Sequence, residues 1–97
     1  IMNIFKKDGT IYIDGELDIF NAQDVRVRVL DEYEKSKSDI VLDFSHVSFM
    51  DSTGLGVLIS IQKVLNDDGY KLRIVNVDPK IKKIFVITEL EEVFDIK

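Results

Sequence analysis

The sequence of 97 residues has no cysteine, no tryptophan, one proline and a single histidine, His46. Without cysteine the chain can form no disulfide framework, and one histidine is too few for a zinc or iron site with ordinary ligand spacing. The chain does not open with a basic segment followed by an apolar core and a cleavage site. We therefore expect no metal and, by default, a cytoplasmic protein.

Basic residues and long apolar runs are also scarce. The 13 Lys and Arg are outnumbered by 18 Asp and Glu, which gives a net charge of -5, whereas binding to a nucleic-acid backbone depends on a basic patch. The longest mostly apolar run, residues 54–61, falls far short of the ~20 residues that a membrane span needs. We expect neither nucleic acid nor a membrane as a partner.

The first third of the sequence predicts a β-hairpin followed by a helix. Two short β-prone runs flank an Asp-Gly turn signal, which is typical of an antiparallel pair of strands. Apolar residues then recur at three- and four-residue steps, which indicates an amphipathic helix with Asn21 or Asp18 as its N-cap. The two runs are Asn3–Lys6 and Thr10–Asp14, and the helical stripe is Ala22, Val25, Val29 and Tyr33.

The rest of the sequence predicts strands that alternate with helices. A near-continuous apolar run indicates a central strand, and Asp78 before Pro79 is typical of a helix start. In order, we expect a strand at Ile40–Phe44, a loop at Ser45–Met50, a helix from Asp51 to about Asn66, a strand at Lys71–Val77, a helix after Asp78 with the buried stripe Ile81, Ile84 and Phe85, and a last strand at Val93–Ile96.

The order ββαβαβαβ indicates a small α/β sandwich. Helices between successive strands imply right-handed crossovers, so the sheet should be mixed and mostly parallel, with an N-terminal β-hairpin and with helices packed mainly on one face. The length fits one domain, residues 2–97.

No segment carries a convincing catalytic pattern. A triad of Ser52, His46 and Asp51 can be written down, but the nucleophile-elbow motif G-x-S-x-G is absent. The pair Gly54 and Gly56 is too short for a dinucleotide-binding fingerprint, and no phosphate-binding loop follows it. We expect no catalytic residue and no cofactor.

The most informative segment is Asp51–Gly56, DSTGLG. An aspartate or serine at a helix start is usually a cap for the first-turn amides. Gly54 and Gly56 each cost roughly 1 kcal/mol of helix propensity against alanine, so a bare backbone is required there either by a close partner or by tight packing on the sheet. The apolar residues of the following helix cover more than one stripe, so part of its surface is either exposed for binding or buried by a neighbouring element.

The segment Val41–Gly56, VLDFSHVSFMDSTGLG, closely resembles the signature of bacterial anti-sigma factor antagonists, the STAS domain family. Gly15–Asp18, GELD, is similar to the family's other motif, which lies at the mouth of the same loop. Both motifs match with the expected spacing, and the resemblance extends over essentially the whole chain. It implies a STAS-like sandwich. Family members usually continue into a final helix, whereas this sequence ends at Lys97, so we expect one STAS domain in which that helix is either cut off from the given sequence or absent from this member.

The resemblance also implies a phosphorylation switch. In that family the serine directly after the aspartate is phosphorylated by a partner that is both a serine kinase and an anti-sigma factor, which here selects Ser52, with Thr53 as the second choice. That kinase supplies ATP, and a PP2C-like phosphatase reverses the reaction. The unphosphorylated chain would bind the kinase and release a sigma factor. The implied partner-binding residues are Asp18, Asp51, Ser52, Thr53, Gly54, Leu55 and Gly56.

Two other functions remain as alternatives. STAS-like domains also occur in anion transporters and lipid-transport complexes, where the serine loop would be a docking or anion site without phosphate cycling. A hydrolase using Ser52 is the third class, which a serine-directed fluorophosphonate probe would detect. The sequence does not specify an oligomeric state.

Overall fold

Residues 3–97 are described by a computed structural model in which the elements follow in the order ββαβαβα. Met2, the predicted start of the domain, lies outside the described residues. The strands are β1 (Asn3–Lys7), β2 (Thr10–Leu17), β3 (Ile40–Met50) and β4 (Leu72–Val75), and the helices are α1 (Ala22–Lys35), α2 (Ser52–Asp67) and α3 (Pro79–Ile87).

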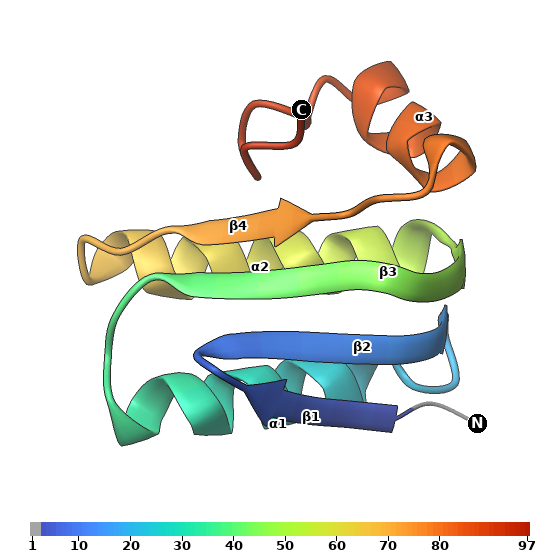
Figure 1. The fold of residues 1–97 in the computed structure, drawn as a ribbon. Coiled ribbons are helices and arrows are strands. Elements are labelled where there is room, and N and C mark those ends of the chain that lie inside the picture. The colour runs from blue at the N-terminus through green and yellow to red at the C-terminus, as the bar shows by residue number, and fades with distance from the viewer. Residues whose placement is uncertain (1–2) are drawn as a thin grey trace.

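The strands form one mixed sheet in the order β1-β2-β3-β4 (Figure 1). β1 and β2 are antiparallel and are joined by the predicted turn, where Asp8 and Gly9 have φ angles of 51° and 83°. β2 pairs with β3, and β3 with β4, in parallel. The predicted α/β class and the mixed, mostly parallel sheet with an N-terminal hairpin are confirmed.

α1 and α2 lie side by side on one face of the sheet, as predicted, and α3 lies beyond β4 (Figure 1). Arg26 of α1 joins the two helices, because its Nε donates a hydrogen bond to the Ser60 hydroxyl at 3.1 Å. In the part of the chain that the structure describes, no helix combines the length and the apolar character needed to cross a membrane. The core between sheet and helices includes Ile11, Ile13, Val25, Val29, Leu42, Leu58 and Ile61.

β3 runs on to Met50, so the prediction of a loop at Ser45–Met50 was wrong. Its pairing with β2 shifts twice, first between Asp43 and His46 and again between Val47 and Phe49, which leaves extra residues on β3. Each shift is a β-bulge, and a bulge breaks the two-residue alternation by which a strand is recognised in a sequence.

The first bulge is supported by a buried carboxylate. Asp43 accepts hydrogen bonds from the Ser45 amide and from the Asn76 side chain, each at 2.8 Å. Burial raises the pKa of Asp43, but these hydrogen bonds outweigh it, and the pKa lies below its ordinary value. Asp43 therefore remains charged while it joins β3 to the residue after β4.

The predicted strand at Val93–Ile96 was also wrong, because residues 91–95 form turns and Ile96 belongs to no strand. The Ile96 amide donates to the Glu91 carbonyl at 2.7 Å, and Asp95 has a φ of 56°, so the segment folds back on itself. Phe94 is nevertheless fully buried, with its ring 5.7 Å from that of Phe85. The segment is held by side-chain burial and by one hydrogen bond from the Ile74 amide to the Phe94 carbonyl, rather than by the hydrogen-bond ladder of a strand.

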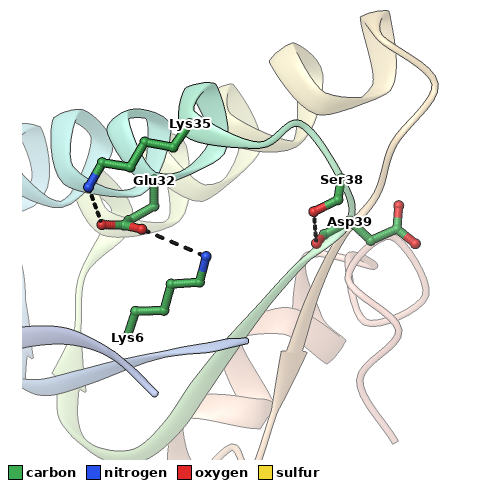
Figure 2. Close-up of polar contacts among 5 residues, drawn as sticks. All are labelled: Lys6, Glu32, Lys35, Ser38 and Asp39. Carbon is green, nitrogen blue, oxygen red and sulfur yellow. Dashed lines mark hydrogen bonds and ion pairs between the residues drawn. The ribbon is translucent and has the colours of Figure 1, made fainter. Parts of the chain in front are cut away.

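Polar contacts at the end of α1 tie it to the hairpin and shape the turn into β3 (Figure 2). Glu32 accepts a hydrogen bond from Lys35 at 3.0 Å and pairs with Lys6 of β1 at 3.7 Å. The Ser38 hydroxyl donates to the Asp39 carbonyl at 3.3 Å. Exposed ion pairs of this kind contribute little to stability, so they define the local geometry more than they strengthen the fold.

A buried tyrosine joins the C-terminal ends of α1 and α2. The Tyr33 hydroxyl donates to Oδ2 of Asp68 at 2.6 Å, and Nζ of Lys37 lies 3.5 Å from the same oxygen. Burial raises the pKa of Tyr33, and the hydrogen bond to Asp68 raises it further. The same hydrogen bond lowers the pKa of Asp68 below its ordinary value.

Candidate functional site

The candidate site lies where β2 and β3 end together. Leu17 and Met50, the last residues of these parallel strands, are paired, so Asp18 and Asp51 begin their loops at the same edge of the sheet. The Asp51 amide donates to the Leu17 carbonyl at 3.2 Å, which fixes the two loops to each other. The predicted proximity of the two motifs, GELD and DSTGLG, follows from this register.

Asp51 is the N-cap of α2, where the sequence left the choice between this aspartate and Ser52 open. Its Oδ1 accepts hydrogen bonds from the amides of Thr53 at 2.9 Å and Gly54 at 3.1 Å, while its carbonyl accepts from the Leu55 amide at 3.1 Å. These bonds satisfy donors that a helix start otherwise leaves unpaired. Ser52 is therefore the first residue of a firmly capped helix, with an exposed side chain.

The second oxygen of Asp51 reaches the other loop. Oδ2 accepts a hydrogen bond from the Ile19 amide at 3.3 Å. Asn21 occupies the N-cap position of α1, one of the two positions that the sequence suggests. Its side chain, however, makes no capping hydrogen bond to that helix. It accepts instead from the Asp18 amide at 2.9 Å, while Oδ1 of Asp18 accepts from the Phe20 amide at 3.0 Å. These side chains stabilise the loop rather than the helix.

The two glycines of α2 have different surroundings. A Cβ atom at Gly54 would lie 2.6 Å from the carbonyl oxygen of Leu17 and 2.7 Å from its Cγ, so glycine is required there by packing on the sheet. A Cβ atom at Gly56 would meet nothing within 4 Å. The packing explanation therefore applies to Gly54 and fails for Gly56, where the bare backbone faces open space.

The apolar surplus of α2 is almost entirely buried. Leu55, Val57, Leu58, Ile61 and Leu65 all lie in the core, and Ile59, at 43% exposure, is the large apolar side chain of α2 that remains exposed. The exposed side of the first two turns consists of Ser52, Thr53, Gly56 and Ile59.

The structure brings all seven predicted partner-binding residues together, but not all at the surface. Ser52, Thr53 and Gly56 are exposed, Asp18 and Asp51 are partly buried, and Gly54 and Leu55 are buried. Sequence reasoning missed Ile19 and Phe20, which lie in the loop between Asp18 and α1 with exposed fractions of 67% and 91%. The available signal was two adjacent apolar residues in a segment where neither strand nor helix periodicity places them in the core.

The ionisable side chains that the two loops of the site carry are acidic. Neither residues 10–25 nor residues 40–62, which supply its two loops, contain lysine or arginine. His46 lies on β3 near Asp43, and no hydrogen bond within residues 3–97 joins it to Ser52. Among the described residues no three His, Asp or Glu side chains are grouped so that they could hold a metal ion.

The structure combines a mixed four-stranded sheet, two helices on one face of it and an exposed serine on the first turn of the helix after β3. Together these features define a STAS-type α/β sandwich. The chain belongs to the STAS domain family, whose sequence model matches residues 2–97.

Individual relatives agree with this assignment. The anti-sigma-B factor antagonist of Bacillus subtilis is 32% identical over 91 residues, which cover 94% of this chain and 83% of that protein. A proposed anti-sigma factor antagonist of Thermotoga maritima has a crystal structure that is 27% identical, covers 95% of this chain and 81% of its own, and superposes with a TM-score of 0.80.

SpoIIAA, an anti-sigma factor antagonist from Bacillus, has been solved in two forms. Its unphosphorylated form covers 90% of this chain and 83% of its own with a TM-score of 0.68, and its phosphorylated form covers 96% and 87% with a TM-score of 0.66. Both are 23% identical to this chain, so the likeness shows the common fold.

Proposed function

We propose that the chain is an anti-sigma factor antagonist whose partner binding is switched by phosphorylation of Ser52. The unphosphorylated chain binds an anti-sigma factor that is also a serine kinase, and the sigma factor held by that protein is released. The kinase supplies ATP, and this chain contributes only the acceptor hydroxyl. A PP2C-like phosphatase removes the phosphate and restores binding, and we place the exchange in the cytoplasm.

The observation that carries this proposal is the position of Ser52. Its side chain is exposed on the first turn of α2, and Asp51 fixes that turn through its bonds to the Thr53 and Gly54 amides. A kinase can therefore reach the hydroxyl without unfolding any part of the domain. The identity to the anti-sigma-B factor antagonist of Bacillus subtilis supports the choice of partner.

The proposed contact surface consists of Asp18, Asp51, Ser52, Thr53 and Gly56. Gly54 and Leu55 belong to the same segment but are buried, so we assign them the task of holding the surface in place. The open space at Gly56, which lies one turn after Ser52, fits a partner whose own backbone comes close to α2.

Phosphate on Ser52 acts through charge and bulk. It adds roughly -1.5 to -2 charges at neutral pH, beside the carboxylates of Asp18 and Asp51. The added group fills the space in which the hydroxyl met the kinase, and repulsion weakens the complex. That SpoIIAA shares this fold in both its unphosphorylated and phosphorylated forms supports a switch that acts at the surface.

The test is a kinase reaction with Ser52→Ala and the matched control Thr53→Ala, followed by intact mass. The proposal expects one phosphate on the wild type and on Thr53→Ala, and none on Ser52→Ala. Phosphate retained by Ser52→Ala and lost from Thr53→Ala would assign the switch to Thr53 instead. A wild type that no serine-kinase anti-sigma factor binds or phosphorylates would favour the alternative, a docking module of a transport complex without phosphate cycling.

Binding provides a second readout of the same proposal. In titration calorimetry Ser52→Ala should keep its affinity for the kinase, whereas Ser52→Asp should lose part of it. The loss is partial because an aspartate carries less charge than a phosphate. Equal affinities of the two variants would count against an interface at this serine.

A further inference from the structure

The loop Ile19–Phe20, which we call the apolar loop, presents unusual side chains to the surface. Of the large apolar residues in the described part of the chain, Phe20 is the most exposed, at 91%, and its neighbour Ile19 is 67% exposed. Neither belongs to the core cluster of the domain. The fold therefore gains no buried apolar area from these two side chains.

The backbone under these side chains is fixed. The amides of Ile19 and Phe20 are bound by the carboxylates of Asp51 and Asp18, at 3.3 Å and 3.0 Å. The amides on either side are bound as well, that of Asp18 by the Asn21 side chain and that of Asn21 by the Asp18 carbonyl. A partner that binds Ile19 and Phe20 would therefore spend no binding free energy on ordering the loop backbone. Preorganisation of this kind strengthens binding.

The apolar loop is joined directly to the serine. Asp51 holds the Ile19 amide with Oδ2 and the first turn of α2 with Oδ1. The apolar loop and the helix turn that carries Ser52 are thus joined through one carboxylate at one end of the sheet, and a protein that binds one of them is in position to contact the other.

The charges around the apolar loop restrict what can bind there. The segments that supply the site, residues 10–25 and 40–62, carry Glu16, Asp18 and Asp51 but no lysine or arginine. An anionic lipid surface would be repelled by these carboxylates, and a second copy of the chain would bring the same charges against them. The complementary surface is that of a different protein, with an apolar pocket edged by basic side chains.

We propose that Phe20 and Ile19 are the anchor residues through which the serine kinase of the proposed function binds this domain. The two side chains insert into an apolar pocket of the kinase while Ser52 faces the ATP that the kinase holds. This inference rests on the proposed function, because it takes that kinase as the occupant. Aromatic side chains that enter a pocket on the partner commonly dominate the binding energy of an interface. Phe20 is accordingly the principal anchor and Ile19 the secondary one.

The test compares Phe20→Ser with Ile87→Ser as the matched control. Ile87 is also a strongly exposed apolar residue, at 78%, but it lies on α3 beyond β4, whereas the apolar loop follows β2 (Figure 1). Neither side chain lies in the core, so both variants should melt with the wild type. We expect Phe20→Ser to weaken the complex with the kinase that phosphorylates the wild type by roughly 10- to 100-fold, and Ile87→Ser to leave it unchanged.

Kinetics separate this inference from the proposed function. Phe20→Ser should raise KM for phosphorylation while kcat at saturation stays near the wild-type value, because Ser52 itself is intact. If Ser52 is phosphorylated but Phe20→Ser has the wild-type KM and affinity, the anchor is overturned and the proposed function stands. If no kinase acts on the wild type, the proposed function fails, and with it the choice of occupant.

Two measurements test whether the apolar loop instead binds a second copy of the chain or a membrane. Sedimentation of the wild type and Phe20→Ser tests for a second copy, and flotation with vesicles of anionic phospholipid tests for a membrane. A monomer that does not float supports the proposal. Self-association or flotation that Phe20→Ser abolishes would overturn it, because the apolar loop would then serve a dimer or a lipid surface.

Discussion

Alanine substitutions at the two glycines of α2 should have different effects on the free energy of unfolding. At Gly56 a methyl group meets nothing within 4 Å, so Gly56→Ala should gain the helix propensity of alanine, roughly 1 kcal/mol. At Gly54 the same methyl group would lie 2.6 Å from the Leu17 carbonyl oxygen. That oxygen is part of the backbone and accepts the hydrogen bond from the Asp51 amide, so it cannot move without disturbing the site.

The pair of variants isolates the packing contribution. Overpacking of this kind costs about 1–3 kcal/mol, and the gain in helix propensity is common to both variants. Gly54→Ala should therefore be less stable than Gly56→Ala by about 1–3 kcal/mol. In a domain of this size about 1 kcal/mol moves Tm by roughly 4–8 °C, so calorimetry resolves the difference.

The reasoning would be refuted if Gly54→Ala were as stable as Gly56→Ala, or if Gly56→Ala fell below the wild type. Binding adds a test of the contact surface, because a methyl group at Gly56 stands where the proposed partner comes close to α2. Gly56→Ala should thus gain stability and lose affinity for the kinase. A variant that gained stability and kept full affinity would remove Gly56 from the contact surface.

Two further predictions concern charge. Tyr33 has a raised pKa and Asp68 a lowered one, so their hydrogen bond stabilises the fold between the ordinary pKa values of aspartate and tyrosine, about 4 and about 10. This stability is lost as the pH rises past about 10, where Tyr33 of the unfolded chain begins to ionise, and as the pH falls below about 4, where Asp68 of the unfolded chain begins to be protonated. The difference in unfolding free energy between wild type and Tyr33→Phe, measured in urea, should shrink at both extremes, and a difference constant from pH 3 to pH 11 would contradict this. Phosphorylation of Ser52 should lower stability by less than about 1 kcal/mol, since the Asp51 carboxylate already occupies two first-turn amides and the helix dipole only partly offsets repulsion between exposed charges. Amide spectra should change only near Ser52, whereas shifts spread through β3 and β4 would mean that the phosphate refolds the domain.

The sequence predicted the class, the sheet and the helices because their patterns are local. The Asp-Gly turn, the stripe of α1 and the Asp78–Pro79 helix start each depend on neighbouring residues. The Val93–Ile96 segment has residue types that are common in strands, but whether it pairs depends on the rest of the chain, and Phe94 is buried there without a ladder.

The candidate site was predicted in part for the same reason. A cap at the start of α2 is a local feature and was expected from the sequence, but the structure was needed to choose Asp51 over Ser52. No sequence pattern distinguishes Gly54, which packs on Leu17, from Gly56, which faces open space. The exposure of Phe20 likewise depends on how the loop is held by Asp51, which is distant in the sequence.

The bulges in β3 make the length of that strand as important as its composition. Residues Thr10–Leu17 of β2 run beside Val41–Met50 of β3, so the longer segment absorbs its extra residues in the two bulges. If both bulges were kept, deleting one residue between Asp43 and Met50 would draw Asp51 back along β2 by about 3.3 Å and turn Met50 to the other face of the sheet. Exposed positions such as Ser45 and Ser48 can accept other side chains, but an insertion or deletion that neither bulge absorbs would separate the loop at Asp18 from the loop at Asp51.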